Sequence, residues 1–163
     1  MKNIILMIIG MLFTTASFAD DNFDLKCTLD DGVKMTVSHG SNTVYIAFFA
    51  PGDDPDEGGG VIKLDIPSGE VKQDILYYDG QIHFFGLRGD SPDSDDAVVV
   101  SFLRDTKIFL GNEGVKHVYT NEMTFISQNK MTGKNIEDKC IPDTIRLGKS
   151  LTEKGIHNVA YIQ

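Results

Sequence analysis

Apolar and polar residues alternate with a period of two over most of the chain, which is typical of β-strands that bury one face. The clearest unit is the segment 75–85, in which two strand-like runs flank Asp79-Gly80. This pair predicts a tight hairpin, because a type I′ turn needs positive φ at both central residues. Pairing across the turn places Tyr77 beside Ile82.

The same alternation predicts strands along the rest of the chain. A second hairpin is expected to turn at Asp31-Gly32. The other predicted strands are 23–29, 33–39, 44–49, 61–66, 97–103, 107–110, 115–119 and 123–127, with turns at Gly111-Asn112 and near Thr120-Asn121. About nine strands at a spacing of roughly ten residues predict an all-β fold. We expect a single antiparallel β-sandwich or small barrel of about 8–10 strands.

One short helical turn is predicted near the C-terminus, where residues 150–153 (SLTE) have the form of a capping box. Gly155 can end such a turn, and Gly148 weakens any longer helix, so we expect one or two turns at most. Residues 156–162 then form either a last short strand or a loose end.

The first nineteen residues of the 163 have the three parts of an export signal. Lys2 supplies a positive start, residues 4–13 form an apolar run, and residues 17–19 (SFA) form a small-x-small cleavage site. The apolar run is too short to cross the bilayer as a helix, which takes about 20 residues. We therefore expect a cleaved signal peptide at 1–19, a single β domain at 20–163 without a membrane anchor, and a periplasmic or secreted location.

The two cysteines, Cys27 and Cys140, are predicted to form a disulfide, because exported proteins fold in oxidising compartments. For a closed loop of this size the chain-entropy model gives roughly 4–5 kcal/mol of stabilisation. A zinc site needs four ligands, usually including closely spaced pairs, and the chain has no CxxC pair. The bridge is therefore interpreted as structural.

Acidic residues are concentrated in the first half of the mature chain. Residues 20–97 hold 17 Asp and Glu against five Lys and Arg, whereas residues 98–163 hold seven against nine. The net charge is −9 for the whole chain, and it becomes −10 without the leader, whose one charged residue is Lys2. This balance argues against nucleic acid as the main partner, because phosphate binding relies on Lys and Arg.

Two Asp-rich segments, predicted as loops at 51–60 and 89–96, account for much of the acidic excess. Their carboxylates are Asp53, Asp54, Asp56, Glu57, Asp90, Asp93, Asp95 and Asp96. One interpretation is that they are solvated loop tips that keep the protein soluble. The other is a binding surface, since acidic loops on a rigid β scaffold steer and orient a cationic protein. We take these eight residues as the candidate partner-binding site.

Calcium is a further candidate ligand of the acidic segments. Asp54, Asp56 and Gly59, with Asp65 eleven residues after Asp54, partly match a twelve-residue calcium loop. Position five of that pattern is Gly58, which has no side chain. We assign no metal ligand and no cofactor, and keep calcium shared between the two acidic loops as an alternative.

Catalytic signatures are absent from the sequence. There is no HExxH and no G-x-S-x-G, which excludes zincins and α/β-hydrolases. His83 is interpreted as a half-buried cross-strand residue rather than a general base. A Ser–His–Asp set assembled from distant strands stays open, since triads are defined in space. We assign no catalytic residue and expect a protein that is not an enzyme.

The mature start at 23–32 (FDLKCTLDDG) resembles the opening of small exported bacterial β-barrel proteins of the periplasmic or membrane-bound C-type lysozyme inhibitor kind, which also have a Cys-bearing first strand before an Asp-Gly turn. The resemblance implies an eight-stranded barrel that blocks a lysozyme active site through a Ser-Gly-x-x-Tyr loop. Here Lys72 stands where that loop has Tyr after Ser68-Gly69, so no inhibitory residue is carried over.

The functional hypothesis is an exported, non-enzymatic binding protein, either an inhibitor or an immunity factor. Its partner would be a cationic protein that acts on the cell envelope, such as a cell-wall hydrolase. The alternative is a calcium-dependent adhesion or carbohydrate-binding module. The charge split along the chain supports the first hypothesis, and the sequence leaves the oligomeric state open.

Overall fold

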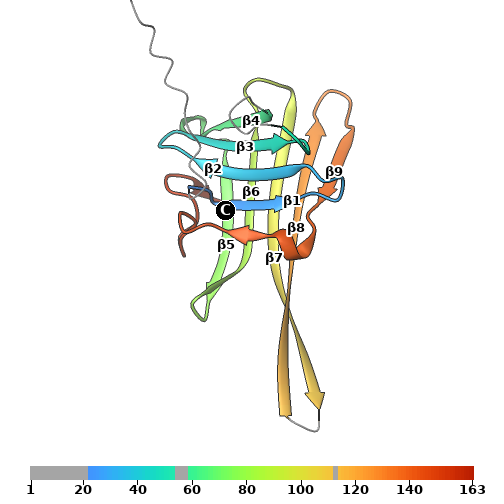
Figure 1. Ribbon diagram of the computed structural model, residues 1–163. Helices are drawn as coiled ribbons and strands as arrows, with labels where there is room; N and C mark the ends of the chain where they lie inside the picture. Colours follow the sequence, from blue (N-terminus) through green and yellow to red (C-terminus); the bar gives the residue numbers. More distant parts are fainter. Residues whose placement is uncertain (1–21, 54–58, 112–113) are drawn as a thin grey trace, which may run out of the picture.

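The computed structural model of the chain describes residues 22–53, 59–111 and 114–163, which form two β-sheets (Figure 1). In spatial order the five-stranded sheet consists of β10 (Arg146–Leu147), β1 (Leu25–Thr28), β2 (Lys34–His39), β3 (Thr43–Phe49) and β4 (Gly60–Asp65). The six-stranded sheet consists of β11 (Ala160–Tyr161), β5 (Lys72–Tyr78), β6 (Gln81–Asp90), β7 (Asp96–Gly111), β8 (Gly114–Asn129) and β9 (Asn135–Lys139). All neighbouring strands are antiparallel except β5 and β11, which are parallel.

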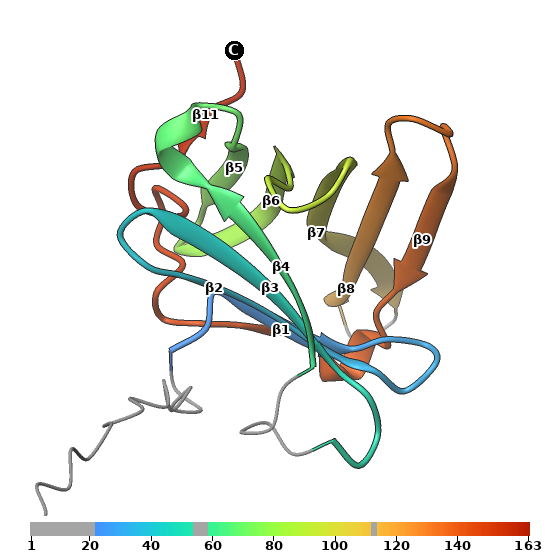
Figure 2. The same cartoon turned by 90° about the horizontal axis from the view of Figure 1, so that it is seen from above.

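The two sheets pack as a sandwich, with the strands of one sheet running across those of the other (Figures 1 and 2). The alternating positions that face inward form one core, which includes Leu25, Met35, Ile46, Leu64, Phe85, Val100 and Phe102. The all-β sandwich predicted from the period-two pattern is therefore confirmed. The described strands do not close into a barrel, so the eight-stranded barrel implied by the resemblance is not the architecture of this chain.

Both predicted Asp-Gly hairpins are present. Asp79 and Gly80 have φ of 52° and 73°, as a type I′ turn requires, and Tyr77 pairs with Ile82. At the first hairpin only Gly32 has positive φ, 90°, and its N–H donates to the Leu29 carbonyl oxygen at 2.9 Å. Two neighbouring strands thus pair across each predicted turn.

In the predicted late meander the pairing of residues 107–110 with 115–119 is confirmed, but the breaks that separated them from strands 97–103 and 123–127 are wrong. Residues 96–111 form the single strand β7 and residues 114–129 form the single strand β8, with no turn near Thr120-Asn121. The two strands pair without interruption, so that Thr120 lies opposite Asp105 and Asn121 opposite Arg104. Because each residue there has a partner across the ladder, polar side chains do not break the strand.

The predicted helical turn at residues 150–153 is also absent. The Ser150 hydroxyl contacts the Phe23 carbonyl oxygen and Asp24 instead of the third backbone N–H of a helix, and residues 152–155 form a tight turn. The described helices are two three-residue 3-10 turns, η1 (Ile66–Ser68) and η2 (Pro142–Thr144). Neither these nor any other helix in the described ranges could cross a bilayer.

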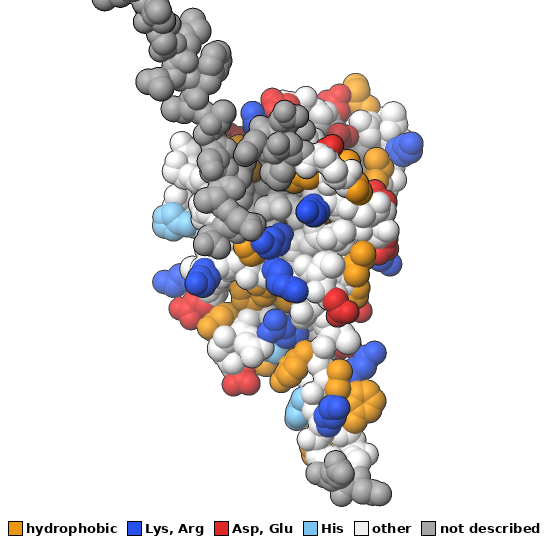
Figure 3. Space-filling view, viewed as in Figure 1, with side chains coloured by type: hydrophobic (Ala, Val, Ile, Leu, Met, Phe, Trp, Pro, Cys, Tyr) orange, Lys and Arg blue, Asp and Glu red, His pale blue; other side chains and the backbone are white. Residues whose placement is uncertain are grey.

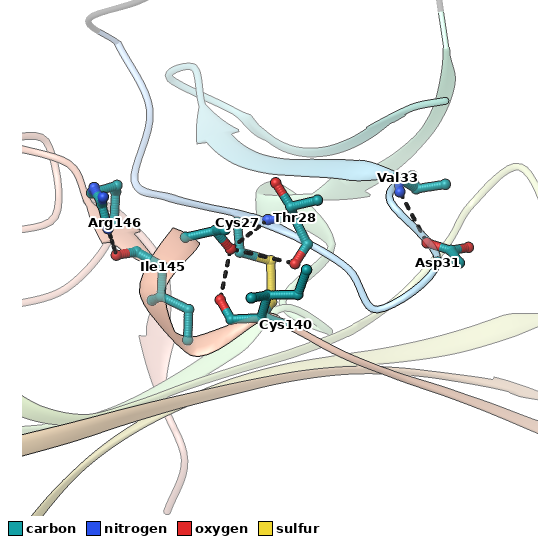
Figure 4. Close-up of a disulfide and its surroundings, with 9 residues drawn as sticks. Cys27, Thr28, Asp31, Val33, Cys140, Ile145 and Arg146 are labelled. Carbon is teal, nitrogen blue, oxygen red and sulfur yellow. Dashed lines mark hydrogen bonds between the residues drawn. A yellow bond between two sulfur atoms is a disulfide. The ribbon is translucent and has the colours of Figure 1, made fainter. Parts of the chain in front are cut away.

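The predicted disulfide between Cys27 and Cys140 joins the two sheets at one corner (Figure 4). Cys27 lies in β1, and Cys140 directly follows β9. The backbone N–H of Cys140 donates to the Met123 carbonyl oxygen of β8 at 2.9 Å, and the next N–H, that of Ile141, donates to the Thr28 carbonyl oxygen of β1 at 2.8 Å. The bridge therefore links segments 113 residues apart that the backbone also holds together.

The C-terminal segment is fixed by a buried glutamine. Gln73 in β5 is 1 % exposed, and its side-chain amide bonds to the backbone of Ile156 and Val159. This anchor places β11 parallel to β5, so the last short strand considered for residues 156–162 is formed. Gly155 passes directly over the Gln73 amide, where a side chain would not fit.

Candidate functional site

The β6–β7 loop, one of the two acidic segments, has a fixed backbone. Ser91 N–H donates to the Asp96 carbonyl oxygen at 3.0 Å, which closes the base of the loop. From the neighbouring β8–β9 turn, Lys130 N–H donates to the Asp95 carbonyl oxygen at 2.9 Å. Ser91 is buried, so the loop is anchored to the sandwich on both sides.

Two of the four carboxylates in this loop have structural partners. Asp96 accepts hydrogen bonds from the Ser94 hydroxyl and the Asn129 amide, each at 3.1 Å. Asp90 forms an ion pair with Lys130 at 3.0 Å, in which both side chains are almost half exposed. These contacts hold the β6–β7 loop against the β8–β9 turn.

The other two carboxylates, Asp93 and Asp95, point their charge into solvent. Both residues are exposed, and among the described residues neither side chain has a hydrogen bond or an ion pair. Because the backbone of the loop is fixed, the two unpartnered carboxylates are held in position to bind a positively charged group. The four Asp residues predicted as one group are therefore divided into two that shape the loop and two that are available for binding.

Exposed apolar side chains occur in the β8–β9 turn, which hydrogen-bonds to the acidic loop, and on β9. Met131, next to Lys130 in the β8–β9 turn, is 81 % exposed, and Ile136 in β9 is 53 % exposed. Strand β9 is an edge of the six-stranded sheet and pairs only with β8. This surface, which we call the acidic edge, is defined by Asp93, Asp95, Lys130, Met131 and Ile136.

The first acidic segment lies elsewhere. The end of β3 and the β8–β9 turn are at opposite sides of Figure 2. Asp53 closes a turn, since its carboxylate accepts the Ala50 N–H at 2.8 Å. The other three predicted residues of this segment, Asp54, Asp56 and Glu57, lie outside the described residues.

Asp65, the last residue of the calcium pattern, lies at the far end of the extended strand β4, roughly 17 Å from Gly60. Asp54 and Asp56, the other carboxylates of that pattern, lie outside the described residues. Among the described residues, no three His, Cys, Asp or Glu side chains are grouped so that they could hold a metal ion.

A Ser–Asp–His cluster does occur, but with the wrong order of contacts for catalysis. The fully buried Asp24 accepts a hydrogen bond from His39 Nδ1 at 2.8 Å, and Ser150 Oγ lies 2.7 Å from the other Asp24 oxygen. In a catalytic triad the serine contacts the imidazole, which takes its proton. Here the serine contacts the carboxylate, so the cluster ties the segment before β1 to β2 and to the segment after β10.

His83 differs from the predicted half-buried cross-strand residue: it is buried, and it lies at a register shift between β5 and β6, where the ladder gives it no partner. It is 7 % exposed, and its ring stacks on Tyr78 with centroids 3.5 Å apart and an interplanar angle of 15°. Tyr77 and Tyr78 themselves are 40 % and 51 % exposed, whereas Phe85 is fully buried. The β5–β6 hairpin therefore carries two exposed rings near its turn, and β6 contributes Phe85 to the core.

The outer face of the five-stranded sheet carries a basic surface that sequence reasoning missed. Lys26 and Arg146 lie opposite each other on β1 and β10, and Lys34 and Lys63 occupy outward positions of β2 and β4. Figure 3 shows several Lys and Arg side chains across this face. A hollow of about 400 Å³ on the same face includes Phe23, Lys26, Lys34, Phe49 and Asp53 in its lining. The available signal was the placement of lysines at the polar positions of the alternating pattern.

Comparison of the chain with models of protein families, with curated proteins and with solved structures finds no match.

Proposed function

We propose that this chain is an exported, non-enzymatic protein that binds a cationic protein partner, as an inhibitor or an immunity factor against an envelope-active protein such as a cell-wall hydrolase. The observation that carries the proposal is the pair of exposed carboxylates, Asp93 and Asp95, on a loop whose backbone is fixed at both ends. A preorganised loop binds with little ordering cost, because its conformation is the same before and after association.

The charge of the acidic edge supports fast and oriented association. The carboxylates attract a basic surface over about 8–10 Å at physiological salt, and this attraction raises the association rate more than the final affinity. Met131 and Ile136, in the β8–β9 turn and on β9, supply the apolar contact that the core of an interface needs. The partner expected from this combination presents Lys or Arg around an apolar pocket.

Export is the second part of the proposal. It is supported by the leader pattern at residues 1–19 and by the disulfide between Cys27 and Cys140, since disulfides persist in oxidising compartments. The absence of a nucleophile–base pair in the Asp24 cluster supports a binding role rather than catalysis.

The proposal is tested by a pull-down from envelope and secreted extracts, with the oxidised chain 20–163 as bait at low and high salt. We expect a basic protein that is retained at low salt and released at high salt. The variant Asp93→Asn/Asp95→Asn should lose it, while Asp143→Asn/Glu153→Gln, which removes the same charge elsewhere, should retain it.

Two results would contradict this function. Equal retention by the two double variants would show that the acidic edge is not the binding surface. Retention of glycan, or binding only when calcium is added, would favour the adhesion or carbohydrate-binding module instead.

A further inference from the structure

Strands β7 and β8 extend beyond the sandwich as a two-stranded ribbon. Strand β6 pairs with β7 only as far as Leu103, and β9 pairs with β8 only from Thr124 onward. Residues 104–111 and 114–121, which we call the arm, therefore have no third strand beside them, and Figure 1 shows the arm projecting from the body. Isolated two-stranded ribbons are marginally stable in water, so a projecting one calls for an explanation.

One face of the arm continues the core-facing side of the six-stranded sheet. Phe102 and Met123 form the last buried pair on this side. Because side chains alternate along a strand, the next pairs on the same side are Arg104–Asn121, Thr106–Tyr119, Ile108–His117 and Leu110–Val115. Within the body this side is covered by the five-stranded sheet, whereas along the arm it is uncovered.

The uncovered face is strongly apolar. Leu110 is 83 % exposed, Ile108 61 %, Val115 60 % and Tyr119 54 %. Figure 3 shows hydrophobic side chains along the arm, next to Lys or Arg. Four large apolar side chains on one side of a ribbon form a patch of the kind that marks an interaction surface.

Charge is segregated to the opposite face. Asp105, Lys107 and Lys116 lie on that side, between the apolar positions of the alternating pattern. Within the described part of the arm, the apolar face carries a single charged residue, Arg104. It lies at the base of the arm, where its guanidinium donates hydrogen bonds to Asn121 and Gln81. The opposite face also carries Phe109, which is 53 % exposed, but this ring lies among charged side chains, whereas the first face has large apolar side chains without charges beyond Arg104.

We propose that the apolar face of the arm packs against the same face of a second copy of this chain, so that the protein forms a two-fold dimer. A two-fold interface places one patch against itself, which suits a face without charges beyond its base and would not suit the face that bears Lys107 and Lys116. The second copy supplies the covering sheet that the body supplies to Phe102 and Met123.

A lipid surface fits this arrangement less well. Lysines that assist membrane binding lie beside the apolar side chains that enter the bilayer, whereas Lys107 and Lys116 point to the opposite side of the ribbon. The outer edges of a two-stranded ribbon also carry unpaired N–H and C=O groups, which hydrocarbon does not tolerate. The apolar part of the face consists of four large side chains per copy, which makes the interface a small one, so the dimer is expected to dissociate in the micromolar range.

Sedimentation velocity of the oxidised chain 20–163, from about 1 to 200 µM, tests the proposal, with a monomer–dimer equilibrium expected across this range. The variant Ile108→Thr/Leu110→Thr should weaken dimerisation about tenfold or more, because threonine keeps the strand but removes apolar area. The matched control, Phe109→Thr/Val118→Thr, changes two apolar side chains on the opposite face and should leave the equilibrium unchanged. Thermal unfolding of each variant verifies that the body is folded.

A second measurement fixes the geometry. Ile108 lies near the middle of the arm, where a two-fold axis brings each residue close to its own copy, so Ile108→Cys should form an intermolecular disulfide and Phe109→Cys should not. A monomer at every concentration, or equal weakening by both double variants, would overturn the proposal. Binding of monomers to phosphatidylglycerol vesicles, lost in Ile108→Thr/Leu110→Thr, would overturn it in favour of a membrane surface.

Discussion

The side chain of Gln73 and the backbone of Ile156 form a reciprocal pair of hydrogen bonds. Gln73 Oε1 accepts the Ile156 N–H at 2.7 Å, and Gln73 Nε2 donates to the Ile156 carbonyl oxygen at 2.9 Å. A third bond joins Nε2 to the Val159 carbonyl oxygen at 2.9 Å. One buried side chain thus serves as a strand partner for a segment more than 80 residues away.

Replacing this amide should detach the C-terminal segment. Gln73→Leu removes three hydrogen bonds and leaves the Ile156 N–H and the Val159 carbonyl oxygen without the amide, while the Ile156 carbonyl oxygen still accepts the Val159 N–H. We expect the change to cost about 2–4 kcal/mol of unfolding free energy. Urea unfolding measures the loss, and hydrogen exchange should show faster exchange at Ile162, whose N–H donates to Gln73 O. Gln128→Leu, at an exposed position of β8, is the control, and an equal effect of both changes would contradict this role of Gln73.

Gly155 is predicted to be intolerant of alanine for two reasons that can be separated. Its φ is +73°, and an added Cβ would overlap the Gln73 amide. Gly69 has a nearly equal φ of +77° but open space around it. Gly69→Ala should therefore cost about 1 kcal/mol through the backbone alone, and Gly155→Ala clearly more. Similar melting temperatures for the two variants would show that the close approach to Gln73 is not limiting.

The disulfide should contribute strongly to stability. Cys27→Ala/Cys140→Ala opens a loop of 113 residues, and we expect a loss of about 2–5 kcal/mol in denaturant unfolding. Dithiothreitol should destabilise the native protein by a similar amount and leave the double variant unchanged. An unfolding midpoint that does not respond to reduction would contradict this prediction.

The buried carboxylate of Asp24 should be required for folding rather than for any reaction. Asp24→Ala removes the partner of His39 and one of the two partners of Ser150, and we expect it to lower the unfolding free energy by about 2–4 kcal/mol. Ser150→Ala should cost about 1 kcal/mol, since His39 still binds Asp24. Asp30→Ala, at an exposed turn position, should have little effect. If Asp24→Ala matched this control, the cluster would not be structural.

Most strands and turns of this chain can be predicted from its sequence, because they depend on residues that are close together in the chain. Alternation places Met35, Ile46 and Phe85 on inward faces whatever surrounds them. The turn at Asp79-Gly80 follows from the ease with which these two residues adopt positive φ. The disulfide could be predicted as well, since only two cysteines are present and residues 1–19 have the pattern of an export signal, which predicts an oxidising compartment.

The composition of the acidic edge required the tertiary structure. The sequence presents Asp90, Asp93, Asp95 and Asp96 as equivalent members of one acidic loop. Packing against the end of β8 and the β8–β9 turn gives Asp90 the Lys130 ammonium and Asp96 the Asn129 amide, whereas Asp93 and Asp95 remain exposed. Lys130 and Asn129 are 33 residues or more away in the chain, so no local pattern reveals the difference.

The sequence by itself determined an all-β chain with its tight turns, its inward-facing residues and its one disulfide. Tertiary structure alone decided that β7 and β8 run on through Thr120-Asn121 as an arm, since a strand continues wherever a partner completes its ladder. It also decided where the inward-facing side of β7 and β8 becomes exposed. The two sheets cross, and the five-stranded sheet ends before β7 and β8 do, so it does not pack against their ends (Figure 1). The alternating pattern predicts which side of a strand is apolar, but the packing of the two sheets determines which residues lie against that side.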